Sequence, residues 1–99
     1  MLKIREVFDG NRNRLQIIAE ILKKTREPTG KTNIMSRCNM SSMQSGQYLN
    51  FMKSSDLIRA DAIAGKVTYQ MTQTGREFLE LYDKIILLLD PNISAPSLI

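Results

Sequence analysis

The sequence of 99 residues contains no histidine and no tryptophan, and Cys38 is its single cysteine. A lone thiol cannot form a disulfide within the chain, and without imidazoles it cannot complete a zinc site. The commonest general base is missing as well, and neither clustered carboxylates nor a cofactor fingerprint replaces it. We therefore expect no enzyme, no metal and no cofactor, and we interpret Cys38 as a small core residue.

Long apolar runs are also missing. The longest is IILLL at 85–89, whereas a membrane span needs about 18 or more apolar residues. The first ten residues lack the apolar segment of a signal peptide. With 42% apolar and 24% charged residues the composition is that of a globular domain. We expect one soluble domain in the cytoplasm, with no membrane partner.

Negative charge is absent from a long central stretch. No carboxylate lies between Glu27 and Asp56. Residues 1–66 carry 12 basic and 6 acidic side chains, whereas residues 67–99 carry 2 and 4. This asymmetry indicates a polyanionic partner for the first two-thirds of the chain, although a solvated basic face would have the same composition.

The segment EPTGKT at 27–32 ends like the phosphate-binding loop of nucleotide hydrolases. That loop requires a glycine where this sequence has Thr25, and a strand must lead into it. Here the preceding segment, RLQIIAEILKKTR, has apolar residues at helical spacing. We interpret EPTGKT as a bend between two helices, with Thr32 capping the second one.

The same spacing predicts the two helices on either side of this bend. The first covers residues 13–24, with Asn13 as its N-cap. The second is short and ends near Asn39, a residue type that tolerates the left-handed conformation after a helix.

A third helix is predicted over residues 41–54, beginning with the capping-box pattern of Ser41 and Gln44. Its inward face is apolar apart from Ser45. Its outward face is polar but largely uncharged, which is unusual because solvated helices tend to carry Glu and Lys. The outward residues are Met43, Gln47, Asn50 and Ser54, with Ser42 and Gly46 at the margin.

Two strands, LIRAD and KVTYQM, are predicted to form a hairpin around the turn-like AIAG. The last helix is expected to start at Thr74, in a capping box with Glu77, and to stop at Pro91. It carries more apolar residues than a small core requires, so we expect it to pair with a second copy, unless the C-terminal tail covers them. The predicted dimer-interface residues are Phe78, Leu81, Tyr82, Ile85, Leu88 and Leu89.

The resulting order predicts an α+β, mainly helical fold, the winged helix-turn-helix, with three helices, a β-hairpin wing and a C-terminal dimerisation helix. We assign residues 1–12 to an N-terminal arm or short helix, 13–72 to the DNA-binding domain, 73–90 to the dimerisation helix and 91–99 to an irregular tail. In such a fold the helix at 41–54 enters the major groove and the hairpin follows the backbone or minor groove.

Two sets of residues are therefore expected to contact double-stranded DNA. Amide, hydroxyl and thioether groups can read base edges, and basic residues neutralise phosphates. The predicted base-reading residues are Ser42, Met43, Gln47 and Asn50. The predicted phosphate-contacting residues are Lys31, Thr32, Arg37, Lys53, Arg59, Lys66, Arg12 and Arg14. Alternatively, Met43 contacts the domain's own surface, and Arg12 and Arg14 are simply solvated.

Three segments, AEILKKTREPTGKTNIMSRCNMS, YLNFMKSSDLI and YQMTQTGREFLELYDKI, resemble the archaeal winged-helix DNA-binding proteins, a family of basic regulators and chromatin-associated proteins. The resemblance covers about residues 14–86 and implies a DNA-binding homodimer that pairs through the C-terminal helix. Ser45 and Gly46 depart from the family, which tends to carry larger residues there, and Pro91 ends the last helix earlier than in some relatives. The motif residues are Gly30, Lys31, Thr32, Asn39, Ser41, Tyr48, Leu49, Leu57, Ile58 and 72–78.

A nucleoid-associated dimer that regulates transcription is the leading hypothesis. An architectural protein that coats DNA with little sequence preference is a close alternative. A protein–protein interaction module is the third, because fold does not fix function. The sequence indicates neither the target DNA nor the direction of regulation nor an effector.

Overall fold

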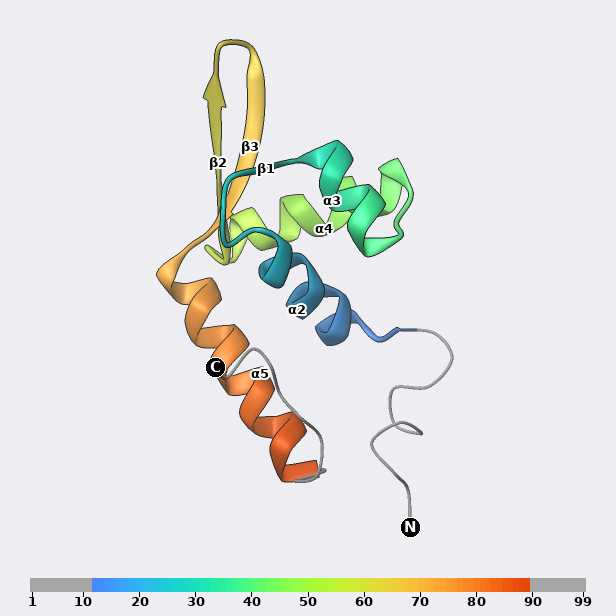
Figure 1. The fold of residues 1–99 in the computed structure, drawn as a ribbon, viewed down its shortest axis with the longest axis vertical. Helices are drawn as coiled ribbons and strands as arrows, with labels where there is room; N and C mark the ends of the chain where they lie inside the picture. Colours follow the sequence, from blue (N-terminus) through green and yellow to red (C-terminus); the bar gives the residue numbers. More distant parts are fainter. Residues whose placement is uncertain (1–11, 90–99) are drawn as a thin grey trace.

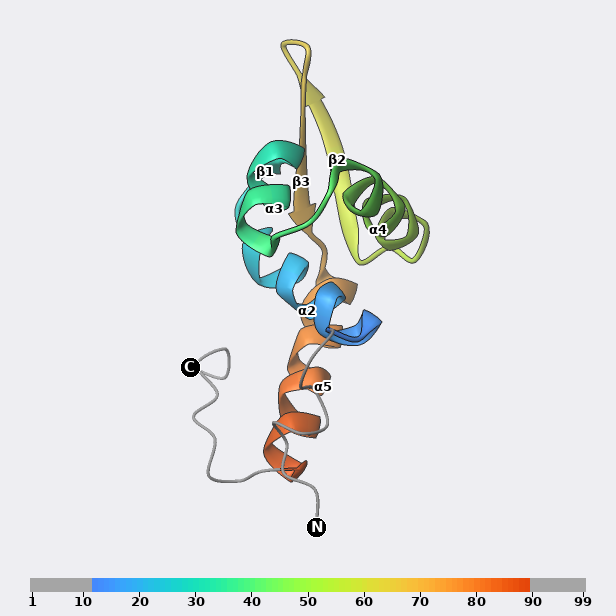
Figure 2. The ribbon, with the colours of Figure 1, turned by 90° about the vertical axis from the view of Figure 1, so that its right-hand side faces the viewer.

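The computed structural model describes residues 12–89, and these have the predicted order of elements. Figures 1 and 2 show that the β2–β3 hairpin projects beyond the short helices at one end, and that α5 projects at the other. The predicted tail lies outside the described residues, as does all of the predicted arm except Arg12. The elements are α2 (Arg14–Lys24), β1 (Thr29–Gly30), α3 (Lys31–Cys38), α4 (Ser42–Ser54), β2 (Ile58–Ile63), β3 (Lys66–Met71) and α5 (Gln73–Leu89).

Three predicted helix ends are confirmed. The Asn13 side chain accepts a hydrogen bond from the Gln16 amide at 2.8 Å and caps α2. Asn39 ends α3 in the left-handed conformation, with φ 54° and ψ 57°. The Ser41 hydroxyl accepts from the Gln44 amide at 3.1 Å and caps α4. Each of these ends is fixed by a bond between near neighbours in the chain.

The segment after α2 differs from the prediction, because it enters the sheet. Thr29 and Gly30 form strand β1, which pairs antiparallel with β3 in a sheet of order β1-β3-β2. The chain passes directly from this strand into α3, so Gly30 is the N-cap and no side chain caps the helix. The predicted Thr32 cap is therefore wrong. Thr25 is buried and donates its hydroxyl to the Ile21 carbonyl at 2.9 Å, which makes it part of the core.

The start of α5 also differs from the prediction. The hydroxyl of Thr72 accepts a hydrogen bond from the Gly75 amide at 3.0 Å, and the helix begins at Gln73. Thr74 instead donates to the carboxylate of Asp56 at 3.4 Å. The capping box predicted at Thr74 is therefore wrong by two residues.

The hairpin is closed by a turn of two residues rather than four. Ala64 and Gly65 both have positive φ, 53° and 79°, as two-residue hairpin turns require. Strand β2 therefore continues to Ile63, which pairs with Lys66. The wing is longer and tighter than the sequence indicated.

The core lies where α2, α3 and α4 meet the base of the hairpin and the first half of α5. Cys38 belongs to it, as predicted, and burial raises the pKa of its thiol. Among residues 12–89, no helix is long and apolar enough to cross a membrane. The fully buried side chains with the largest volume are Ile21, Leu22, Ile34, Leu49, Met52, Ile58, Thr25 and Ser45.

Candidate nucleic-acid interface

Helix α4 has one face in the core and one in solvent. Ser45, Leu49 and Met52 are buried, at helical spacing. This packing leaves the opposite face open, with Met43 76% exposed. The predicted base-reading residues all lie on the solvent side of α4 and are all exposed: Ser42, Met43, Gln47 and Asn50.

Lys31 lies over the first turn of α4. Its ammonium donates to the Ser42 hydroxyl at 3.4 Å. A Cβ built on Gly46 would lie 3.6 Å from the same nitrogen, an ordinary van der Waals distance, so Gly46 lies beside the lysine but the position would also accept alanine. The two neighbouring residues that depart from the family pattern thus have different surroundings: Ser45 lies in the core, and Gly46 lies beside Lys31. Sequence reasoning missed this contact, because Lys31 and Gly46 belong to different helices.

Further basic candidates lie on α4 itself and on the neighbouring helices. Arg37 and Lys53 are exposed, as is Thr32 at the start of α3. Arg14, the first residue of α2, is exposed and lines a hollow of about 610 Å³ between α2 and α4, together with Gln47 of the reading face. Exposed apolar side chains, Leu15 and Phe51, line the same hollow.

The wing contributes two basic residues with different surroundings. The Arg59 guanidinium donates to the Gln70 side chain at 3.0 Å and lies 3.4 Å from the Asp61 carboxylate. Gln70 in turn donates to the Arg26 carbonyl at 3.2 Å. Lys66 is exposed beside the turn. Arg59 is therefore held on one face of the wing, and its charge is partly neutralised. Lys66 lies at the tip of the wing.

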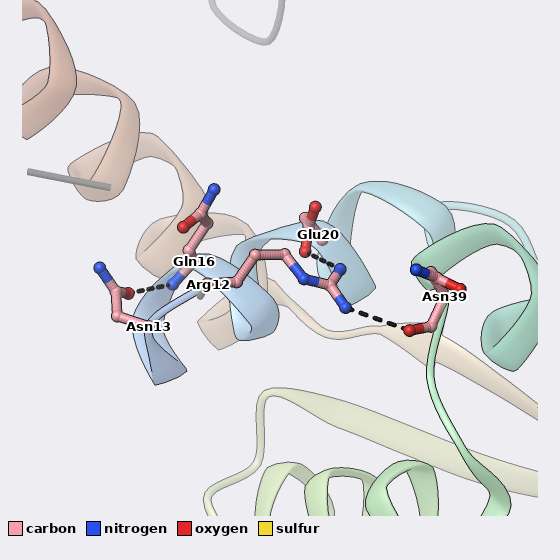
Figure 3. Close-up of polar contacts among 5 residues, drawn as sticks. All are labelled: Arg12, Asn13, Gln16, Glu20 and Asn39. Carbon is pink, nitrogen blue, oxygen red and sulfur yellow. Dashed lines mark hydrogen bonds and ion pairs between the residues drawn. The ribbon is translucent and has the colours of Figure 1, made fainter. Parts of the chain in front are cut away.

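Arg12 differs from the other candidates, because its guanidinium is bound within the protein (Figure 3). One nitrogen, Nη1, lies 2.6 Å from Oε2 of Glu20, and Nη2 donates to the Asn39 carbonyl at 3.3 Å. Both charged side chains are about two-thirds buried or more, with relative exposures of 27% and 35%. No local pattern in the sequence indicated this pair, whose members are eight residues apart.

The six predicted interface residues of α5 fall into two groups. Phe78 and Tyr82 are half-buried and pack on the core, with ring centroids 6.4 Å apart and nearly parallel planes. Burial, with smaller effects of the Glu20 and Asp83 carboxylates, raises the pKa of Tyr82. The other four form an exposed apolar stripe: Leu81, Ile85, Leu88 and Leu89.

Comparison with known proteins gives a consistent result. A family model described as winged helix-turn-helix matches residues 11–90. No curated protein sequence matches the chain significantly.

Several solved structures have the same fold. The DNA-binding protein Sso10a-2 from Sulfolobus solfataricus is 16% identical, with a TM-score of 0.72, covering 78% of this chain and 81% of that one. The transcriptional regulator BldR from the same organism is 17% identical with a TM-score of 0.64, over 79% of this chain and 62% of that one. A MepR mutant from S. aureus, bound to an oligodeoxyribonucleotide, is 13% identical with a TM-score of 0.62, over 93% and 72%.

Proposed function

The chain belongs to the winged helix-turn-helix family, and we propose that it is a nucleoid-associated dimer that binds double-stranded DNA and regulates transcription. One observation carries the proposal. The exposed face of α4 presents amides, a hydroxyl and a thioether, and it is bordered by Lys31 and Lys53. No carboxylate lies in the chain between Glu27 and Asp56 to oppose a polyanion there.

In this proposal α4 occupies the major groove. The Gln47 and Asn50 amides can each pair with the edge of an adenine, and the Met43 side chain can contact a thymine methyl. Ser42 can bond to either kind of base, and its hydrogen bond to Lys31 holds that ammonium beside the groove. These contacts would supply sequence preference.

Phosphate contacts supply the affinity and set the position of α4. Lys53 lies on α4, Arg14 lines the hollow beside it, and Thr32 and Arg37 lie on α3. In this proposal all four meet the two backbones that flank the groove. Lys66 at the tip of the wing, with Arg59 nearer its base, would reach the backbone beyond the site. Each phosphate neutralised releases counterions, which makes binding weaken as salt rises.

The exposed stripe of α5 is the proposed dimer interface. Four large aliphatic side chains exposed on one helix form a patch that soluble monomers avoid. The described helix has 17 residues, or about 26 Å of length, enough to align with a second copy. A two-fold axis through this contact would present two α4 helices to half-sites about 34 Å apart, or to a multiple of that spacing.

Two alanine variants separate the two kinds of contact. Gln47→Ala should reduce the preference for the best DNA sequence by roughly 5- to 100-fold, the value of one good base contact, with an unchanged salt dependence. Lys53→Ala should weaken binding to all duplexes alike and make the slope of log affinity against log salt shallower by about 1.8, which is about 0.9 for each protomer of the dimer. Titration of labelled duplexes measures both.

The results for these two variants also distinguish the proposed regulator from a protein that coats DNA without sequence preference. If Gln47→Ala changes nothing while Lys53→Ala weakens all binding, the protein coats DNA without reading it. If both variants bind as the wild type does, α4 is not the reading helix and the proposal is wrong.

A further inference from the structure

Arg12 lies between α2 and the end of α3 and contacts both. It stands just before the Asn13 cap of α2, and its side chain runs along the helix to Glu20 (Figure 3). The other end of the same guanidinium donates to the carbonyl of Asn39 at 3.3 Å. The ion pair at 2.6 Å is only partly exposed, so water screens it less than a surface pair. One side chain thus joins α2 to the end of α3.

Asn39 begins the three-residue turn between α3 and α4. It has left-handed geometry, and the Met40 amide closes the end of α3 on the Met35 carbonyl at 2.9 Å. The next residue, Ser41, caps α4. The Asn39 carbonyl lies past the helical hydrogen bonds, and the Arg12 guanidinium donates to it at 3.3 Å. This bond constrains the direction in which the chain leaves α3 and enters the reading helix.

The surroundings of Cys38 support this placement. Burial raises the pKa of the Cys38 thiol, the Glu20 carboxylate adds to the rise, and the Arg12 guanidinium opposes it. Both members of the ion pair therefore lie close to the last residue of α3. Glu20 also raises the pKa of Tyr82 on α5, after the larger effect of burial.

We propose that Arg12 is a positioning residue: it fastens the α3–α4 turn to α2 and so sets the orientation of α4 on DNA, rather than contacting a phosphate itself. This inference rests on the proposed function, and it removes Arg12 from the predicted phosphate-contacting residues. Arg14, two residues on and exposed, keeps the phosphate role and serves as the matched control.

The salt dependence of DNA binding separates the two roles. Arg14→Ala should make the slope of log affinity against log salt shallower by about 1.8, which is about 0.9 for each protomer of the dimer. Arg12→Ala should weaken binding roughly three- to fivefold with an unchanged slope, because a smaller fraction of molecules holds α4 correctly. An Arg12→Ala variant whose slope is shallower by about 1.8, as for a lost phosphate contact in each protomer, or whose affinity equals that of the wild type, would overturn the inference.

Glu20→Gln gives a test in which the two roles predict opposite signs. If Arg12 contacts a phosphate, Glu20→Gln should tighten DNA binding, because it removes a negative charge and frees the guanidinium. As a positioning pair, however, Glu20 and Arg12 act together, so Glu20→Gln should weaken binding about as much as Arg12→Ala does. Tighter binding by Glu20→Gln would refute the inference. Melting curves, recorded first, set a temperature at which every variant is folded.

A measurement on the free protein keeps this inference separate from the proposed function. The Met40 amide, which closes the turn, should exchange with solvent several-fold faster in Arg12→Ala and Glu20→Gln than in the wild type or Arg14→Ala. Unchanged exchange would refute the positioning role. If the wild type fails to bind duplex DNA, the proposed function is wrong, and this exchange measurement alone still decides what Arg12 does.

Discussion

Replacing Gly75 with alanine should destabilise the fold strongly, although Gly75 lies in a helix, where alanine is normally preferred. A Cβ at this position would lie 2.2 Å from the Leu57 carbonyl oxygen. It would also lie 2.9 Å from side-chain carbons of both Leu22 and Met71. The backbone of α5 passes so close to the start of the hairpin that only glycine fits.

The cost follows from these contacts. Separating the Cβ from a main-chain oxygen requires a shift of about 1 Å, and overpacking of this kind costs roughly 1–3 kcal/mol. The Leu57 carbonyl also accepts a hydrogen bond from the Thr72 amide at 3.1 Å, and weakening that bond adds up to about 1 kcal/mol. Because the Cβ would meet a main-chain oxygen and two side chains at once, the upper end of the overpacking range applies, about 3 kcal/mol. Subtracting the gain from replacing a helical glycine, at most about 1 kcal/mol, leaves an expected net loss of roughly 2–3 kcal/mol.

Thermal unfolding followed by circular dichroism measures this loss. For a domain of this size it corresponds to a melting temperature lower by about 10 °C or more. All variants must be compared at one protein concentration, since dimerisation would make the melting temperature depend on it.

Gly46→Ala is the matched control, because its Cβ would meet only the Lys31 ammonium, at an ordinary 3.6 Å. It should raise stability by roughly 0.5–1 kcal/mol. If Gly75→Ala melts at or above the wild-type temperature, α5 does not pack on Leu57 in the way described here.

Further predictions concern the dimer interface and the core thiol. Ile85→Glu should convert the proposed dimer to a monomer, because it places a charge in the α5 stripe. Gln73→Glu, in the first turn of α5, should leave the dimer intact. Light scattering measures both masses, and an unchanged mass for Ile85→Glu would place the interface elsewhere. Cys38 should react with iodoacetamide far more slowly in the native protein than in denaturant, because burial covers the thiol and raises its pKa; equal rates would contradict its burial. Since that pKa is raised above its ordinary value of 9.0, the stability that Cys38 contributes should be complete below about pH 8 and decline at higher pH; a Cys38→Ala variant should lack this part of the decline in alkaline melting curves.

Local patterns explain why so much of the fold was readable from the sequence. The inward residues of α4 repeat at helical spacing, and Ser41 caps the helix through a neighbour three residues away, so both features were predicted correctly. The fold class is confirmed by the family match over residues 11–90. The base-reading and dimer-interface assignments stay predictions: the base-reading residues and four of the six interface residues lie exposed on the expected helices, whereas Phe78 and Tyr82 pack on the core.

The features that were predicted wrongly or missed depend on contacts between segments that are distant in the sequence. Strand β1 has two residues and exists because β3 pairs with it, so no local pattern marks it. Both Thr72 and Thr74 are able to cap a helix, and the close approach of Gly75 to Leu57 favours the first. The partners of Arg12 are likewise brought together only by the folded chain.

Binding of the wild-type protein to labelled duplex DNA at several salt concentrations tests the central claim most directly. A dimer with about 6–8 phosphate contacts should show a slope of log affinity against log salt of roughly −5 to −7. It should also prefer one DNA sequence, for example from upstream of its own gene, over random duplex of equal length. Weak binding with a flat salt response would contradict the account, because the basic border of α4 would then serve some purpose other than holding DNA.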